Sequence, residues 1–229
     1  MPTPKVTRAA RRPVRGPASN NWTMLRVVSR QAEISAESRG RLMAATAELL
    51  AEGGLRAATV QAVSDRAGIS RGSISFHFGS KEALIVAVVN GTFDLLCERI
   101  TAVFESSDRL GWDGLFDAEG VVLSDERFRI FAAVAVEAMG DGGPVAEAFA
   151  VGQSRVRDLY AEYIARHGLV SRGVDPVDVA TALRALTLGL NVHRRFDGDV
   201  ITLRQAIEAL QAVASLPHPK RAQPKRRQG

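Results

Sequence analysis

The residues whose types and spacing best suit a chemical role lie at the start of one short predicted helix, directly after a glycine turn. They are Arg71, Gly72, Ser73, Ser75 and Phe76. Ile74 and Phe78 take the inward positions of the same helix, which leaves the other side chains on its outer side. Residues at the beginning of such a helix contact base edges when the helix lies in the major groove of DNA. The spacing therefore indicates a surface that reads DNA.

Two short helices joined by a tight turn are predicted to position these residues. Apolar residues three and four apart in the segment 60–67 give the first helix one inward face. Thr59 can cap the first turn of this helix, and Gly68 can close the helix in a left-handed conformation. Ser70 is then placed to cap the second helix. This order of caps and apolar positions is typical of a helix-turn-helix.

The flanking sequence decides the interpretation, because any two amphipathic helices joined by glycine would share that spacing. Residues 41–55 read as a preceding helix that stops at Gly53 and Gly54. A following helix begins after Ser80, which can cap it, and carries Glu82 in its first turn. Both neighbours are therefore helices with their own start or stop signals.

Residues 41–84 resemble the complete N-terminal domain of the TetR family of bacterial transcriptional regulators. The matching positions are Leu42, Met43, Ala45, Leu49, Leu50, Gly54, Thr59, Val60, Val63, Ala67, Gly68, Ile69, Ser70, Gly72, His77, Phe78, Ser80, Lys81, Glu82, Ala83 and Leu84. The resemblance implies an all-α protein with a three-helix, helix-turn-helix DNA-binding domain followed by a larger helical domain for effector binding and dimerisation. The residues expected to contact DNA are Thr59, Ser70, Arg71, Gly72, Ser73, Ser75, Phe76, His77 and Lys81.

The sequence departs from the family pattern at two positions. The family usually has a tyrosine that contacts a phosphate where this chain has Ser75, and alanine where it has Ser64. A serine hydroxyl reaches a phosphate only if the backbone comes closer, so Phe76 or His77 is the alternative source of that contact. Ser64 is interpreted as a small substitution that the core tolerates.

The charge of the chain is unevenly distributed. Residues 1–81 contain 13 Lys and Arg and 5 Asp and Glu, a net charge of +8, whereas residues 82–219 contain 12 and 20, a net charge of −8. The last ten residues are basic again, which brings the total to +5. A basic N-terminal module on an acidic body suits a protein that presents one end to DNA, with strongly salt-dependent binding.

The two ends of the chain are expected to be disordered. Residues 1–35 combine prolines with an arginine-rich run, and residues 217–229 form a basic tail. The first segment is either a basic arm that contacts DNA, a solvated tail, or an extension before a start at Met24. The helix-turn-helix domain is placed at residues 36–84 and the larger domain at residues 85–216.

The body of the chain is predicted to be a helical domain of a protein in a reducing cytoplasm. Cys97 is the only cysteine, so no disulfide can form within the chain, and no apolar run is long enough to span a membrane. Residues 175–215 are expected to pair with a second copy and form a homodimer, as the last two helices of the family do. The alternative for the same apolar stripe is core within one chain. A dimer would also let two short reading helices recognise a palindrome.

The effector is expected to be a small molecule, partly apolar, that is held by inward-facing residues of the larger domain. The candidates are Phe93, Cys97, Trp112, Phe116, Phe128, Phe131, Met139, Phe149 and Tyr160. Aromatic residues at helical spacing are also ordinary core, and a lone helical cysteine is usually a buried hydrophobe. For each residue both interpretations stay open.

No catalytic arrangement is found in the sequence, and neither a cofactor nor a metal ion is expected. The chain has no His-Glu-x-x-His, no Gly-x-Ser-x-Gly and no Cys or His pair with metal spacing. The resemblance to the TetR family instead implies a ligand-responsive transcriptional regulator, a repressor, that binds a palindromic double-stranded DNA operator as a dimer. The alternative is a helical small-molecule-binding protein whose basic module binds another polyanion.

Overall fold

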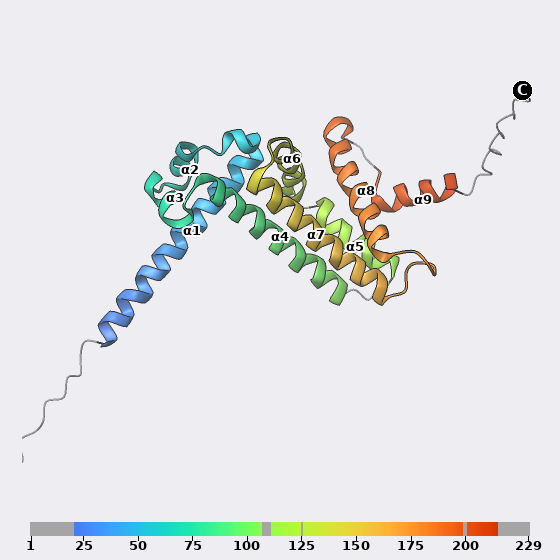
Figure 1. The fold of residues 1–229 in the computed structure, drawn as a ribbon, viewed down its shortest axis with the longest axis horizontal. Helices are drawn as coiled ribbons and strands as arrows, with labels where there is room; N and C mark the ends of the chain where they lie inside the picture. The colour runs from blue at the N-terminus through green and yellow to red at the C-terminus, as the bar shows by residue number, and fades with distance from the viewer. Residues whose placement is uncertain (1–20, 107–110, 125, 199–200, 215–229) are drawn as a thin grey trace, which may run out of the picture. The chain divides into compact units, whose positions relative to one another are not determined.

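The computed structural model describes residues 21–106, 111–124, 126–198 and 201–214 (Figure 1). Within these ranges the chain forms nine helices and no strand, which confirms the all-α prediction. The helices are α1 (Asn21–Ala57), α2 (Val60–Ala67), α3 (Arg71–Phe78), α4 (Lys81–Ser106), α5 (Trp112–Ser124), α6 (Glu126–Asp141), α7 (Gly143–Arg166), α8 (Pro176–Asp197) and α9 (Leu203–Ala214).

The chain divides into two compact units within helix α1, at residue 40. The first unit contains the beginning of α1, whose described side chains from residue 33 onward are exposed or half-buried. We expected no regular structure before residue 36, and this is wrong from Asn21 onward. The prolines of this segment all precede residue 18, and the following residues up to Gly40 contain no helix breaker. Residues 1–20 and 217–229 lie outside the described residues, so their predicted disorder stays a prediction.

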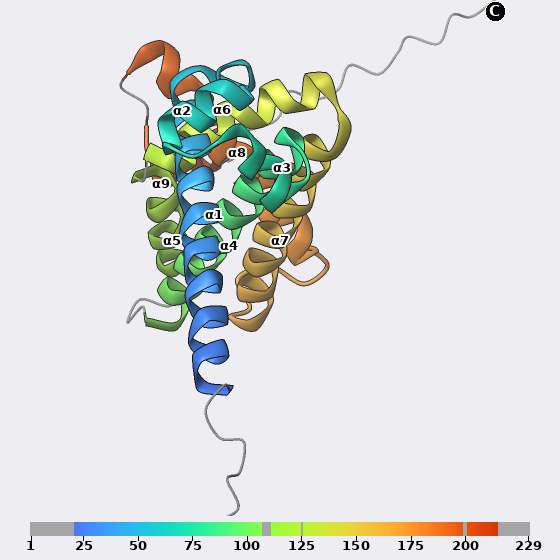
Figure 2. The same cartoon turned by 90° about the vertical axis from the view of Figure 1, so that its left-hand side faces the viewer.

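The second unit, residues 41–229, contains the helix-turn-helix and the larger helical part. It does not separate into two compact units at residue 84, so the domain boundary at that position stays a prediction. In the larger part, α4 and α7 lie side by side in both views (Figures 1 and 2), and α7 packs on α8. Helix α5 packs on α4, and α6 contacts α5, α7 and α8. A continuous apolar core runs from Leu42 on α1 to Ala206 on α9.

Most predicted helix caps are present. The Thr59 hydroxyl accepts a hydrogen bond from the Ala62 amide at 3.1 Å, and Gly68 adopts the left-handed conformation, with φ 63°. The Ser80 hydroxyl accepts from the Ala83 amide at 3.0 Å. The predicted cap at Ser70 is wrong at the level of the side chain: its hydroxyl lies 3.0 Å from the Ser73 hydroxyl instead of capping a backbone amide of α3.

The last two helices begin as predicted. Asp175 accepts a hydrogen bond from the Val177 amide at 2.9 Å, before α8. Before α9, the Thr202 hydroxyl accepts from the Gln205 amide at 3.2 Å, and the Gln205 side chain accepts from the Thr202 amide at 2.8 Å. This reciprocal pair is a capping box, which satisfies two amides that lack partners inside the helix.

Helix α5 is longer than the short helix expected at residues 112–118. It continues to Ser124 through Gly114 and Gly120. Each glycine costs about 1 kcal/mol of helix stability relative to alanine. Burial of Leu115 and Val122 against the core offsets this cost.

Candidate DNA interface and ligand cavities

Helix α3 separates its buried face from its outer face as the sequence predicts. Ile74 is 1% exposed, whereas Phe76 is 80% exposed. Arg71, Gly72 and Ser75 are also exposed, and Ser73 is half-buried. The outer face therefore offers one guanidinium, hydroxyl groups and an exposed ring.

The remaining predicted DNA contacts surround this face. Thr59, Ser70 and Lys81 are exposed, at the starts of α2, α3 and α4 respectively. The His77 ring is half-buried and lies edge to face with the Phe76 ring, at 4.9 Å between centroids. Arg71 and Lys81 make no ion pair with any residue that the structure describes. Both positive charges are therefore available to an anionic partner.

Two other arginines of the module are held by its own structure, and sequence reasoning missed them. The Arg66 guanidinium lies 3.2 Å from Glu48 and 2.8 Å from Glu52, so it ties α2 to α1. The hydrogen bond from Arg66 lowers the pKa of Glu52, and the two carboxylates raise the pKa of Arg66. The Arg41 guanidinium donates to the carbonyl of Ala67, at the end of α2. These contacts anchor the first helix of the helix-turn-helix.

Ser64 lies inside this module. It is 5% exposed, and its hydroxyl finds no hydrogen-bond partner in the part of the chain that the structure describes. An unpartnered buried hydroxyl loses its hydration without a compensating bond, which costs about 1–3 kcal/mol. The core thus accommodates the size of this serine, while its hydroxyl remains unsatisfied.

Four of the nine candidate effector residues line one small cavity, namely Phe93, Phe128, Phe131 and Phe149, and the other five do not line it. Phe93 and Phe149 are buried, and their rings pack with Phe131 at centroid distances of 6.0 and 4.9 Å. The prediction that Trp112 and Met139 face inward is wrong, since they are 38% and 59% exposed. Helical spacing identifies a face of a helix, but it does not say which elements cover that face.

Two further candidates line open hollows on the outside. Phe116 is half-buried beneath the Arg204 guanidinium, which lies 4.3 Å from the ring centroid. Cys97 is half-buried beside Asp94 and Arg155, and burial raises the pKa of its thiol. A raised pKa disfavours the reactive thiolate, so the interpretation of Cys97 as a small hydrophobe is the better supported one.

A buried polar cluster lies in the core of the larger part. Arg184 donates to Glu119 at 3.1 Å, and Glu119 is 1% exposed. Burial alone would lower the pKa of Arg184, but Glu119 and Tyr160 together outweigh this effect, so the pKa is raised. Tyr160 is fully buried next to this pair, and burial raises its pKa well above the usual value. Among the described residues, Glu119 Oε2, Arg184 Nε, the Tyr160 hydroxyl and Asn191 Oδ1 find no hydrogen-bond partner.

The space beside this cluster is small. A cavity of about 30 Å³ is bounded by Arg184, Asn191 and Gln153 on one side and by Phe128 and Phe131 on the other. Such a volume holds a water molecule or one small polar group, which needs two to four polar partners. Arg184 Nε and Asn191 Oδ1 are unsatisfied atoms of residues that line this cavity, so they can supply two such partners.

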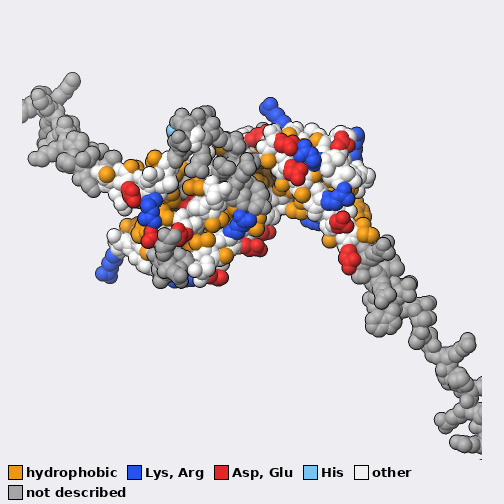
Figure 3. Space-filling model, turned by 180° about the vertical axis from the view of Figure 1, so that it is seen from behind, with side chains coloured by type: hydrophobic (Ala, Val, Ile, Leu, Met, Phe, Trp, Pro, Cys, Tyr) orange, Lys and Arg blue, Asp and Glu red, His pale blue; other side chains and the backbone are white. Residues whose placement is uncertain are grey.

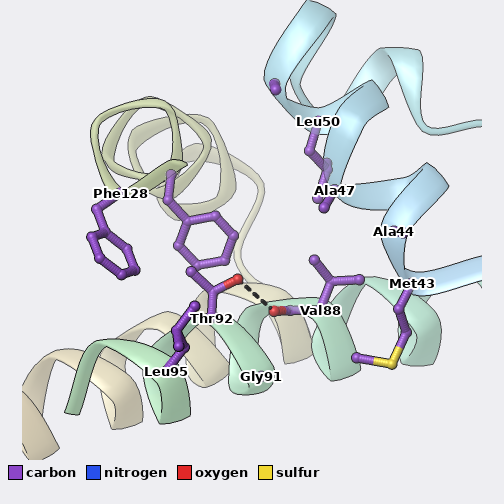
Figure 4. A pocket seen from close by; sticks show the side chains of 11 residues that line it. Met43, Ala44, Ala47, Leu50, Val88, Gly91, Thr92, Leu95 and Phe128 are labelled. Atoms are coloured by element: carbon purple, nitrogen blue, oxygen red, sulfur yellow. Dashed lines mark hydrogen bonds between the residues drawn. The ribbon is translucent and has the colours of Figure 1, made fainter. Parts of the chain in front are cut away.

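A larger cavity, of about 320 Å³, lies between α1, α4 and α6 (Figure 4). Helix α6 contributes Phe128 and Phe131, which also bound the small cavity. The remaining lining residues come from α1 and α4: Met43, Ala44, Ala47, Leu50, Ala51, Val88, Gly91, Thr92 and Leu95. From the sequence we considered mainly aromatic residues as lining and missed these residues. The cavity exists because the small side chains of alanine and glycine do not fill the volume between the helices.

Helices α8 and α9 expose small and apolar side chains. Ala182, Ala185 and Gly189 are exposed on α8, together with Val192 at 37%. Leu210 on α9 is 58% exposed. Hydrophobic side chains are also visible among the charged ones on the face drawn in Figure 3.

Two properties of the described residues concern other classes of site. None of the helices in the described ranges is long and apolar enough to cross a membrane. The side chains of His, Cys, Asp and Glu in those ranges form no group of three that could hold a metal ion.

Comparisons with known proteins agree with this architecture. The family model described as bacterial regulatory proteins, tetR family, matches residues 42–88. The model described as BetI-type transcriptional repressor, C-terminal, matches residues 115–216. Both the helix-turn-helix and the larger helical part are thus covered.

The similar curated proteins match mainly the N-terminal module. The HTH-type transcriptional repressor KstR2 of Mycobacterium tuberculosis H37Rv is 41% identical over 69 residues, 30% of this chain and 34% of that protein. The HTH-type transcriptional regulator CymR of Pseudomonas putida is 41% identical over 71 residues, 31% of this chain and 33% of that protein. Each match therefore spans about a third of the relative.

Solved structures extend the similarity of fold to most of the chain. The reduced form of NemR from E. coli has a TM-score of 0.66 at 19% identity and covers 79% of this chain and 100% of that one. The fatty acid degradation regulator FadR of Bacillus halodurans has a TM-score of 0.62 at 13% identity, covering 78% and 99%. With one family model on each part of the second unit, the chain belongs to the TetR family of bacterial regulatory proteins.

Proposed function

We propose that this protein is a dimeric repressor that binds a palindromic DNA operator and is released from it by a small-molecule effector. The observation that carries the proposal is the outer face of α3, where Arg71 and Ser75 are exposed while Ile74 anchors the helix in the core. Relatives with a similar module are named HTH-type transcriptional repressors. Repression is therefore the mode that we propose for this chain.

Base recognition is assigned to Arg71 and phosphate binding to Lys81. Arg71 is the first residue of α3, and the first residues of a recognition helix contact base edges in the major groove. A guanidinium can bind guanine with two hydrogen bonds. Lys81 begins α4, so its charge lies outside the reading helix and suits a backbone phosphate. The exposed Phe76, next to Ser75, is the group that we propose contacts the DNA backbone where relatives use tyrosine.

The dimer contact is assigned to the exposed face of α8 and α9. Ala182, Ala185 and Gly189 are small, which lets a second helix approach closely. Val192 and Leu210 would lose exposed apolar surface in such a contact. A two-fold dimer presents two copies of α3 to two half-sites, which gives the specificity that one short helix lacks.

The test is DNA binding to the promoter regions that flank the gene, measured by gel shift and fluorescence anisotropy at several salt concentrations. We expect binding to a flanking palindrome that weakens steeply as salt rises. Arg71→Ala should cost about 1–3 kcal/mol of discrimination at one base position of each half-site. Lys81→Ala should weaken binding to specific and random DNA alike and reduce the salt slope by about 0.9 per lost phosphate contact.

The outcomes separate this function from the alternative. Equal binding of heparin, random DNA and every flanking palindrome would favour a module that binds polyanions in general. Equal effects of Arg71→Ala and Lys81→Ala on specific and random DNA would contradict the assignment of roles.

A further inference from the structure

We propose that the cavity between α1, α4 and α6 is a binding site for a neutral apolar ligand that couples directly to the DNA-binding module. The site differs from the buried polar cluster of the larger part, because one of its walls is the first helix of the helix-turn-helix domain. Only the effect of the ligand on operator binding rests on the proposed function. The ligand site itself can be tested without DNA.

The size of the cavity matches a small organic molecule. An apolar cavity of about 150 Å³ holds benzene, and this one measures about 320 Å³. It can therefore hold a hydrocarbon of two or three fused or linked rings. Ala44, Ala47 and Ala51 contribute small side chains to the wall on α1, and all three are exposed.

The chemistry of the lining selects against charge. Among the described residues of the lining, Thr92 supplies the one polar side chain, and its hydroxyl donates to the Val88 carbonyl at 2.9 Å (Figure 4). A charged or strongly polar ligand would lose its hydration here, and the acceptor lone pairs of the Thr92 hydroxyl are the only side-chain partner that the described lining residues offer in return. Phe128 and Phe131 present aromatic surface, and Met43 is a flexible side chain that can adapt to the shape of the guest.

A specific hydrogen bond links this cavity to the turn that precedes the helix-turn-helix. Glu137, on the same helix as Phe128 and Phe131, accepts a hydrogen bond from the Leu55 amide at 2.8 Å. Gly54 makes this contact possible, because it has φ 69° and because a Cβ at this position would collide with the Glu137 carboxylate. Helix α6 therefore holds the end of α1 directly.

A ligand between α1 and α6 makes contacts that depend on the separation of these two helices. It stabilises conformations in which the cavity is open and so shifts the population toward them. The distance between the two copies of α3 in a dimer depends on where α1 and its module lie, and this distance must match the spacing of the two half-sites. We therefore expect the ligand to lower operator affinity, with Glu137 as the positioning residue that transmits the change.

The probe for the site is N-phenyl-1-naphthylamine, a neutral aromatic dye whose fluorescence rises in apolar surroundings. We expect saturable binding to the full-length protein, displaced by naphthalene but not by naphthalene-2-sulfonate. Ala47→Phe fills the cavity and should reduce the affinity for the dye at least tenfold. The matched control is Ala165→Phe, since Ala165 is an exposed alanine of α7 that lines none of the cavities described above. Thermal unfolding of both variants checks that they fold.

The coupling is tested in the protein with an unchanged cavity. Saturating dye should lower operator affinity about tenfold, within the usual range of allosteric coupling. Glu137→Ala should still bind the dye but show less than a threefold effect on the operator. Glu137→Gln, whose amide oxygen can still accept from the Leu55 amide, should retain the coupling.

Three results would overturn the inference: dye binding that Ala47→Phe leaves unchanged, equal displacement by naphthalene-2-sulfonate, or an operator affinity that saturating dye does not alter. Failure to bind any operator in the absence of dye would instead count against the proposed function, and the dye-binding experiment would still decide on the site.

Discussion

Gly152 on α7 provides a sharp test of the packing in the larger part of the molecule. A Cβ built at this position would lie closer than 3.0 Å to three atoms of the Phe93 ring on α4. The Phe93 side chain is 3% exposed and is enclosed by the rings of Phe131 and Phe149, each at a centroid distance of 6.0 Å. The ring is therefore confined by its neighbours, and the cavity of about 30 Å³ that it lines is the free space beside it. We expect Gly152→Ala to destabilise the protein, although alanine favours helices.

The expected magnitude follows from two opposing effects. Alanine in place of glycine stabilises a helix interior by about 1 kcal/mol. Overpacking a close-packed core costs about 1–3 kcal/mol, and the upper end applies here because three atoms of a buried ring lie within 3.0 Å of the added Cβ. The net loss is therefore about 2 kcal/mol, which corresponds to a fall in Tm of about 4–8 °C for a chain of this size.

The assay is differential scanning calorimetry of the full-length protein at a fixed concentration. Gly120→Ala is the matched control, because Gly120 lies within α5 and is exposed, and a Cβ added there would have no neighbouring atom within 4 Å. It should raise Tm, by about 2–4 °C for a gain of up to 1 kcal/mol.

A double-mutant cycle isolates the collision itself. In a Phe93→Ala background the ring is absent, so adding Gly152→Ala should stabilise rather than destabilise the protein. The coupling energy should be about 3 kcal/mol. A Gly152→Ala variant as stable as Gly120→Ala, or a coupling energy near zero, would refute the packing of α4 on α7 described here.

Three further predictions concern buried or half-buried polar groups. Ser64→Ala should raise the free energy of unfolding in urea by about 1 kcal/mol, because it removes an unpartnered buried hydroxyl; equal or lower stability would contradict this account. The raised pKa of Tyr160 means that the folded protein keeps this proton above pH 10 while the unfolded chain releases it, so stability is complete below pH 10 and falls as pH rises further. Urea titrations should therefore show that Tyr160→Phe loses less unfolding free energy than the unsubstituted protein as pH rises from 9 to 11. The difference should reach up to about 1.4 kcal/mol per pH unit above the pKa of an unfolded tyrosine. Identical losses in the two proteins would contradict the raised pKa of Tyr160. Burial raises the pKa of Cys97, so iodoacetamide at pH 8 should alkylate the folded protein several-fold more slowly than the protein in urea, as mass spectrometry can measure; a faster reaction of the folded protein would indicate an activated thiol instead.

Local sequence signals predicted the parts of the fold that depend on near neighbours. Thr59, Gly68 and Ser80 perform the predicted capping roles, because a cap is decided by one side chain and the next three residues. Ser70 occupies the predicted position, but its hydroxyl turns to Ser73, a choice of rotamer that residue type does not determine. The start of α1 at Asn21 was missed because the prolines before it dominated the composition of the segment.

The candidate site was predictable where it lies on one short helix and unpredictable where it is built from several. The outer residues of α3 follow from the inward position of Ile74 alone. The lining of the larger cavity does not, since it combines α1, α4 and α6 and owes its volume to small residues such as Ala47 and Gly91. The hydrogen bond from the Leu55 amide to the Glu137 carboxylate joins residues 82 positions apart, and the sequence around either residue does not indicate its partner.

The α1 wall and the α6 wall of the larger cavity differ in how easily they can move, and this difference predicts which helix a bound ligand would displace. Behind Phe131 stand the buried rings of Phe93 and Phe149, in a core that already excludes a single methyl group at Gly152. The wall on α1 combines the exposed alanines Ala44, Ala47 and Ala51 with Met43 and Leu50. A ligand that needs more room should therefore displace α1 rather than α6. Because α1 belongs to the module that carries α3, we expect ligand binding to shift the DNA-binding surface and to leave the larger helical part unchanged.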